Sequence, residues 1–209
     1  MKKTVVVIAV LLAFVCFALP LYAKRTGARL ISFGYGTDIV LDSDGGDPAF
    51  IGEAIYDICY VGAYGTGGNV GFYYGGNIRL MLNRYSQGKV NTYNLSDFVG
   101  IRMTDIMGFG FVVPIGSSLD LVIGLGPSVS FHCYFQSEPL PYYMDMLFGV
   151  GARTDVVLKF TDSVFIKLAT SICYHFYAEA VSLRTNSVYE GSYRHFGQPE
   201  TALLFGFKY

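Results

Sequence analysis

The feature that most constrains this chain is a long alternation of apolar and polar residues with a period of two. From residue 164 one parity reads Val164, Ile166, Leu168, Thr170, Ile172, Tyr174, Phe176 and Ala178. The other parity holds Lys167, Ala169, Ser171, Cys173, His175, Tyr177 and Glu179. Successive side chains of a β-strand point to opposite faces, so this repeat predicts a strand with one apolar and one polar face.

The length of the alternation distinguishes between two classes of β-protein. Residues 121–135 and 148–160 repeat the pattern, and each face continues for about 12 to 16 residues, whereas strands of globular proteins usually have about 5 or 6. A tilted membrane strand needs roughly 9 to 11 residues to cross the hydrocarbon. The pattern therefore favours membrane-spanning strands over a soluble sandwich.

Eight segments of this kind follow one another along the chain. We predict strands at residues 30–41, 50–64, 71–84, 97–113, 119–135, 144–160, 164–180 and 193–209. Three connectors are short (65–69, 114–118 and 161–163), and the four between them are longer and more polar (42–49, 85–96, 136–143 and 181–192). Short turns at one rim and longer loops at the other are typical of bacterial outer-membrane barrels. The predicted fold class is all-β, a transmembrane antiparallel up-and-down barrel of eight strands.

The composition agrees with a membrane environment. Apolar residues make up 52% of the chain and charged residues 15%, and the net charge is -1. This hydrophobicity excludes a disordered chain, and the lack of a basic excess argues against nucleic-acid binding. Beyond residue 23, no apolar run reaches the roughly 18 residues of a membrane-spanning helix. Helices and closed barrels are the structures that span membranes, so the barrel is favoured.

Residues 1–23 have the organisation of a secretory signal peptide. Two lysines precede an uncharged apolar stretch over residues 5–19, which Pro20 ends. An uncleaved membrane anchor is an alternative, as is a lipoprotein signal at Cys16, although bulky residues precede that cysteine. We expect cleavage after residue 23 and a single barrel domain over residues 24–209, located in the bacterial outer membrane.

The last residues give an independent signal. Leu203, Phe205, Phe207 and Tyr209 lie on one parity, and the chain stops on the aromatic residue. This ending resembles the insertion signal of outer-membrane barrels, which the barrel-assembly machinery reads. Together with the eight segments, it makes residues 24–209 similar to the small eight-stranded barrels of the OmpW, OmpX and OmpA type. The resemblance rests on pattern, and it implies outer-membrane lipid and the export and assembly machineries as partners.

The predicted inward face carries charges of both signs. This lumen set is Glu53, Asp57, Arg79, Arg102, Arg153, Asp155, Lys159, Lys167, His175 and Glu179. An eight-stranded barrel is just wide enough to be filled by side chains or to hold one small ligand. Buried ions are tolerated when paired, so one interpretation is a salt-bridged core. The other is a narrow passage beside inward glycines, which inward Tyr73, Tyr134 and Tyr177 would refill.

One predicted strand contains an anomaly. The apolar parity of residues 97–113 includes Phe109 and Phe111, but also Asp105. A charge that faces lipid costs roughly 2 kcal/mol or more. A β-bulge would turn Asp105 inward, because a bulge shifts the facing by one residue. The sequence leaves the facing of Asp105 open.

No catalytic residue is predicted, and the chain is not expected to be an enzyme. Ser130 and His132 share a face, as do Ser171 and His175. At about 3.4 Å per residue these pairs lie about 7 and 14 Å apart, which strains or excludes a direct hydrogen bond. A pair across the barrel, such as Ser130 with His175, stays open.

No metal or cofactor site is predicted either. The step from Asp42 to Glu53 has the length of a calcium loop, but Asp47 stands where that loop needs glycine. A solvated acidic surface loop is the better interpretation. The cysteines beyond residue 23 are odd in number and form no CxxC pair, so no complete disulfide framework follows.

Two functions are compatible with such a barrel. The first is a narrow pore or conduit for small solutes, which similarity to the OmpW type implies and which the inward glycines favour. The second is a surface scaffold or adhesin whose loops bind a host ligand, as OmpX-like barrels suggest. Residues 181–192, which contain Arg184, are the expected contact surface. From sequence, we favour the pore.

Overall fold

The computed structural model describes residues 27–40, 49–63, 70–86, 89–92, 98–136, 143–182, 187–191 and 196–208. The expected signal peptide, Tyr209 and most of the predicted long loops lie outside these residues. Among the described residues, no helix has the length and apolar character needed to cross a membrane.

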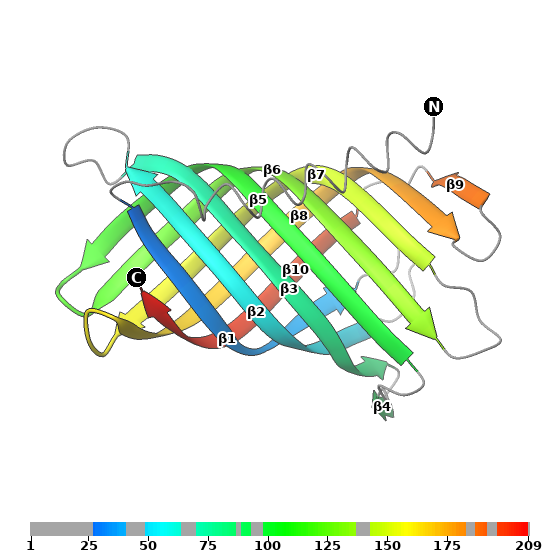
Figure 1. Ribbon diagram of the computed structural model, residues 1–209, viewed down its shortest axis with the longest axis horizontal. Helices are drawn as coiled ribbons and strands as arrows, with labels where there is room; N and C mark the ends of the chain where they lie inside the picture. Colours follow the sequence, from blue (N-terminus) through cyan, green and yellow to red (C-terminus); the bar gives the residue numbers. More distant parts are fainter. Residues whose placement is uncertain are drawn as a thin grey trace.

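Eight long strands of the described chain form a closed barrel (Figure 1). They are β1 (Gly27–Val40), β2 (Ala49–Ala63), β3 (Val70–Ser86), β5 (Phe98–Ile115), β6 (Leu119–Gln136), β7 (Tyr143–Lys159), β8 (Val164–Ser182) and β10 (Phe196–Lys208). Each strand pairs antiparallel with its neighbours, and β10 closes the barrel by pairing with both β1 and β8. The predicted fold is confirmed, and every predicted strand boundary lies within three residues of the observed one.

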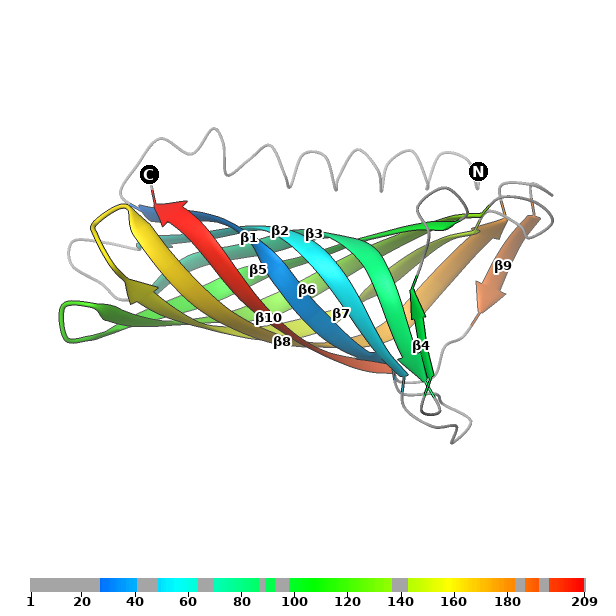
Figure 2. The same cartoon turned by 90° about the horizontal axis from the view of Figure 1, so that it is seen from below.

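The two ends of the barrel differ. At one end, tight turns join β5 to β6 and β7 to β8. Gly116 adopts a φ of 73° in the first turn, a conformation that favours glycine, and Thr161 Oγ1 accepts the backbone N–H of Val164 at 3.0 Å in the second. At the other end lie the short strands β4 (Lys89–Thr92) and β9 (Ser187–Gly191), paired with β3 and β8 (Figure 2). We call these the turn end and the loop end.

The outer wall of the barrel is apolar. Its exposed side chains include Phe33, Tyr35, Phe72, Phe109, Phe111, Leu125, Val150, Leu158, Leu168, Ile172, Tyr174, Phe176, Leu203, Phe205 and Phe207. Soluble proteins rarely expose contiguous apolar patches larger than a few hundred Å². A wall of this kind is suited to hydrocarbon, and it leaves the opposite parity to fill the interior.

A register shift on β8 reverses one predicted facing. Phe148 pairs with Tyr177, but the next residue, Gly149, pairs with His175, so Phe176 is an extra residue in β8. The bulge turns Tyr177 outward, where it is 45% exposed and its ring lies 5.9 Å from that of Phe148. The prediction that Tyr177 faces the lumen is therefore wrong, because the bulge changes the parity after His175.

The described strands have no bulge at Asp105. The β3–β5 register is continuous, with Asp105 opposite Gly76, and the β5–β6 register places it opposite Val129. Asp105 therefore keeps the outward parity of Phe109 and Phe111, and the facing that the sequence left open is outward. The physical reason is a hydrogen bond on the outer wall, where the Tyr74 hydroxyl donates to Asp105 Oδ1 at 2.9 Å.

Candidate functional site

The candidate site is the barrel interior, where inward side chains form two ion-pair networks. The turn-side network consists of Asp57, Arg153, Asp155 and Lys167. The loop-side network consists of Asp38, Glu53, Arg79, Arg102 and Glu200. None of these nine residues is more than 4% exposed.

The turn-side network joins β2, β7 and β8. Arg153 Nη1 lies 2.7 Å from Asp57 Oδ1, and its Nε lies 2.7 Å from Asp155 Oδ1. Lys167 Nζ also pairs with Asp57 and lies 3.5 Å from Asp155 Oδ2. Two cations thus face two carboxylates, and each ion has two partners of opposite charge, as buried ions require.

The loop-side network joins β1, β2, β3, β5 and β10. Glu53 bridges both guanidinium groups, at 3.1 Å from Arg79 Nη1 and 3.0 Å from Arg102 Nη1. Arg79 also pairs with Glu200, and Arg102 pairs with Asp38. Three carboxylates here face two guanidinium groups, so this network carries one more carboxylate than cation.

A serine–histidine pair lies beside the loop-side network. Ser130 Oγ on β6 is 3.1 Å from His175 Nε2 on β8, and it donates to Thr104 Oγ1 at 3.2 Å. The cross-barrel pair that the sequence left open is therefore formed. Among the described residues, His175 Nδ1 has no hydrogen-bond partner, so no carboxylate there orients the ring as a catalytic triad requires.

Apolar side chains separate the two networks and close the turn end. Ile55, Ala169, Ala202 and Leu204 form a cluster whose members alternate along their strands with the charged residues. A larger cluster toward the turn end comprises Leu30, Cys59, Val61, Tyr73, Ile106, Val122, Val157, Phe165 and Cys173. On β2, Ile55 thus lies between Glu53 of the loop-side network and Asp57 of the turn-side network.

Tyr73 fills the space that inward glycines leave. It is fully buried, and a side chain at Gly124 would overlap its ring, while one at Gly75 would overlap its hydroxyl. Pairing a glycine with a neighbouring aromatic ring is a recurrent device in sheets. At Gly75 and Gly124, the space that favoured a passage from sequence is therefore occupied by the Tyr73 side chain.

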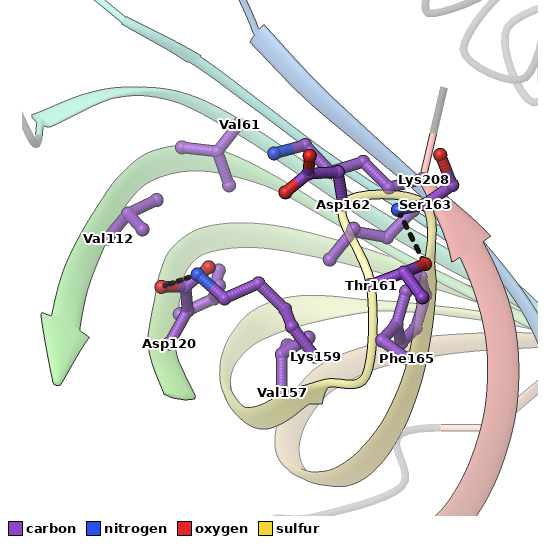
Figure 3. Close-up of a pocket in the computed structure, with 12 residues that line it drawn as sticks. Val61, Val112, Asp120, Val157, Lys159, Thr161, Asp162, Ser163, Phe165 and Lys208 are labelled. Carbon is purple, nitrogen blue, oxygen red and sulfur yellow. Dashed lines mark hydrogen bonds and ion pairs between the residues drawn. The ribbon is translucent and has the colours of Figure 1, made fainter. Parts of the chain in front are cut away.

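A small recess lies at the turn end, with Val61, Val157 and Phe165 among its apolar walls (Figure 3). Lys159 and Asp120 form an ion pair of 2.9 Å in this recess, with side chains 25% and 20% exposed. Lys159 has the predicted inward parity, but it pairs with Asp120 at the turn end and belongs to neither network. It lies at the end of β7, where the interior opens to solvent.

The remaining predicted residues are placed as follows. The structure brings Glu53, Asp57, Arg79, Arg102, Arg153, Asp155, Lys167 and His175 into the interior, whereas the side chain of Glu179 lies outside the described residues. Leu203, Phe205 and Phe207 of the C-terminal signal face outward and are 48–61% exposed. Asp42 and Asp47, the first and sixth positions of the rejected calcium loop, lie outside the described residues, and Glu53 belongs to the loop-side network.

Two members of the loop-side network were missed from sequence, although a signal was present. Asp38 shares the inward parity of Ser32 and Gly36 on β1, and Glu200 lies on the parity opposite the exposed Leu203. In the described part of the chain, no group of three His, Cys, Asp or Glu residues is placed to hold a metal ion.

Comparison with known proteins shows the fold but no close relative. No protein-family model matches the chain, and no curated protein matches it in sequence. Neisserial surface protein A (NspA) matches with a TM-score of 0.55 at 10% identity, over 88% of this chain and 100% of that one. A major outer membrane protein from Thermus thermophilus has a TM-score of 0.49 at 10% identity over 88% and 100%. OprG from Pseudomonas aeruginosa has 0.48 at 11% over 88% and 97%.

The fold is therefore that of the small eight-stranded outer-membrane β-barrels. The resemblance seen in the sequence is confirmed at this level.

Proposed function

We propose that the protein is an integral outer-membrane barrel with a closed lumen, which serves at the cell surface as a rigid scaffold for its loops. The apolar outer wall supports the bilayer location, because exposed rings and aliphatic side chains surround the barrel. By the usual asymmetry of these barrels, the turn end faces the periplasm and the loop end faces outward.

The observation that carries the proposal is the filled interior. A water-filled path would leave the charged lining accessible, whereas the nine network residues are at most 4% exposed. A steady pore would have to displace both networks and the apolar cluster between them. For this reason we prefer the scaffold to the pore that the sequence favoured.

We propose a structural role for the Ser130–His175 pair as well. The pair lies in the barrel interior, where Ser130 also donates to Thr104. Within the described residues, no acid accepts a hydrogen bond from His175 Nδ1. The pair ties β6 to β8 across β7, and it requires no substrate to explain it.

The scaffold proposal is tested by epitope tags on living cells. A tag inserted at residues 183–186 should be stained by antibody on intact bacteria, because the proposal places this connector outside. The matched control is the same tag at residues 116–118, which should be stained only after the outer membrane is permeabilised. Staining of the second tag but not the first on intact cells would reverse the orientation, and staining of neither on intact cells would contradict surface exposure.

A further inference from the structure

Asp105 occupies an unusual position for an acidic residue. It is the eighth of the 18 residues of β5, near the middle of the strand, and its parity is that of the outward Phe109 and Phe111. Unlike those two rings, which are 66% and 38% exposed, Asp105 is only 4% exposed. Acidic residues within the hydrocarbon are rare and expensive, and their retention indicates a function with an identifiable partner. The structure supplies that partner.

The partner is a tyrosine on the neighbouring strand. The Tyr74 hydroxyl donates to Asp105 Oδ1 at 2.9 Å, across Gly76, which pairs with Asp105 in the β3–β5 register. A side chain at Gly76 would overlap both the Tyr74 hydroxyl and Asp105 Oδ1. Tyr74, Gly76 and Asp105 therefore form one fitted seat on the outer wall.

The surroundings of this seat differ from those of the interior carboxylates. Each carboxylate of the two networks meets at least one guanidinium or ammonium group, whereas Asp105 on the wall accepts its hydrogen bond from a neutral phenol. The outward positions next to Asp105 on its own and the two adjacent strands carry no charged residue, and Tyr74 is the titratable residue among them. The remaining positions hold Gly76 and Ile78 on β3, Met103 and Met107 on β5, and Pro127, Val129 and Phe131 on β6.

We propose that Asp105 is a buried proton-binding site at an outward position of the barrel wall, and that Tyr74, itself 1% exposed, and Gly76 form the seat that holds the neutral acid. During insertion the carboxylate takes a proton from the aqueous phase, forms an O–H bond and enters the hydrocarbon without charge. An ionised carboxylate would instead be desolvated with one neutral donor, which is costly. This inference rests on the bilayer location proposed above.

A proton taken up on insertion sets the sign of the pH dependence. The inserted barrel then binds one more proton than the unfolded chain in water, whose free carboxyl ionises near about pH 4. Insertion should therefore become less favourable as the pH rises above that value. Asp105→Asn removes the titrating group but keeps its size and its ability to accept from Tyr74.

The direct test is infrared spectroscopy of the full chain refolded into phosphatidylcholine vesicles at about pH 7. Wild type should show the C=O band of a protonated carboxylic acid, and Asp105→Asn should lose it. Asp120→Asn, which removes a carboxylate paired with Lys159, is the matched control and should leave the band unchanged. In Tyr74→Phe the band should move to higher frequency, because the carbonyl oxygen loses its donor.

Insertion is scored separately by the heat-modifiable gel shift, so two failures can be told apart. Wild type that gives no folded band contradicts the bilayer location and the inference with it. Wild type and Asp105→Asn that both insert and have superimposable spectra in this region overturn the proton site alone. If Asp105→Asn does not insert, the pH dependence of wild-type insertion is the test. A folded fraction of wild type that falls from about pH 5 to about pH 9 supports the site, and a folded fraction that is constant or rises with pH overturns it.

Discussion

The two ion-pair networks inside the barrel are built from the same residue types but differ in balance. The turn-side network has two carboxylates and two cations, with apolar clusters on both sides. The loop-side network has three carboxylates and two guanidinium groups, with Ser130 and His175 beside it. Removal of one carboxylate therefore has opposite consequences for charge balance. It leaves the first network with an excess cation and gives the second equal numbers of each sign.

The largest effect is expected from Asp57→Asn in the turn-side network. The substitution leaves Arg153 and Lys167 with Asp155 as the carboxylate they share. Breaking a buried ion pair by removing one partner costs about 3–5 kcal/mol. Urea unfolding of the refolded barrel in detergent micelles should show a loss of this size. A loss below about 1 kcal/mol would mean that the network is not desolvated.

A double variant sharpens the same point. Asp57→Asn combined with Lys167→Met removes one ion of each sign, and it leaves Arg153 paired with Asp155 at 2.7 Å. The double variant should recover more than half of the stability lost by Asp57→Asn, because no excess cation stays buried. Additive losses in the double-mutant cycle would show that the two residues do not interact.

A smaller effect is expected from Asp38→Asn in the loop-side network. Glu53 and Glu200 then remain to pair with Arg79 and Arg102. The expected loss is about 1 kcal/mol, the contribution of a single hydrogen bond, measured by the same urea titration. A loss equal to that of Asp57→Asn would remove the proposed difference between the two networks.

The smallest effect is expected from Lys159→Met at the turn end. Its ion pair with Asp120 is partly exposed, and exposed pairs contribute about 0 to 1 kcal/mol. The unfolding midpoint of Lys159→Met should differ from that of the wild type by less than the midpoint of any interior variant does. At high salt this difference should become smaller still, because salt screens the exposed ion pair. A larger shift would show that the Lys159–Asp120 pair contributes as much to stability as a buried interior ion pair.

The sequence predicted the strands and their outward faces well. Period-two alternation follows from the local geometry of a strand. Because the outer wall is apolar, every second residue of each strand is apolar, as from Val164 to Phe176, and the alternation can be recognised in the sequence. The C-terminal residues Leu203, Phe205 and Phe207, which the sequence placed on one parity, all face outward.

The sequence could not determine the positions that depend on strand register, contacts across the barrel or distance from a strand end. Tyr177 turns outward because β8 carries an extra residue opposite Phe148 and Gly149, while Asp105 stays outward because Tyr74 on another strand holds it. The contact of Ser130 with His175 depends on the barrel cross-section rather than on spacing along either strand. Lys159 has the inward parity but lies at a strand end, where parity no longer determines burial.

The central claim is that paired ions and apolar clusters close the barrel interior within a bilayer. Planar-bilayer recording of the refolded wild-type protein tests it most directly, with insertion verified independently by the heat-modifiable gel shift. The account predicts a membrane current indistinguishable from that of the protein-free bilayer under steady voltage. Reproducible unitary conductance steps from the inserted wild-type barrel would contradict it and would restore the solute pore.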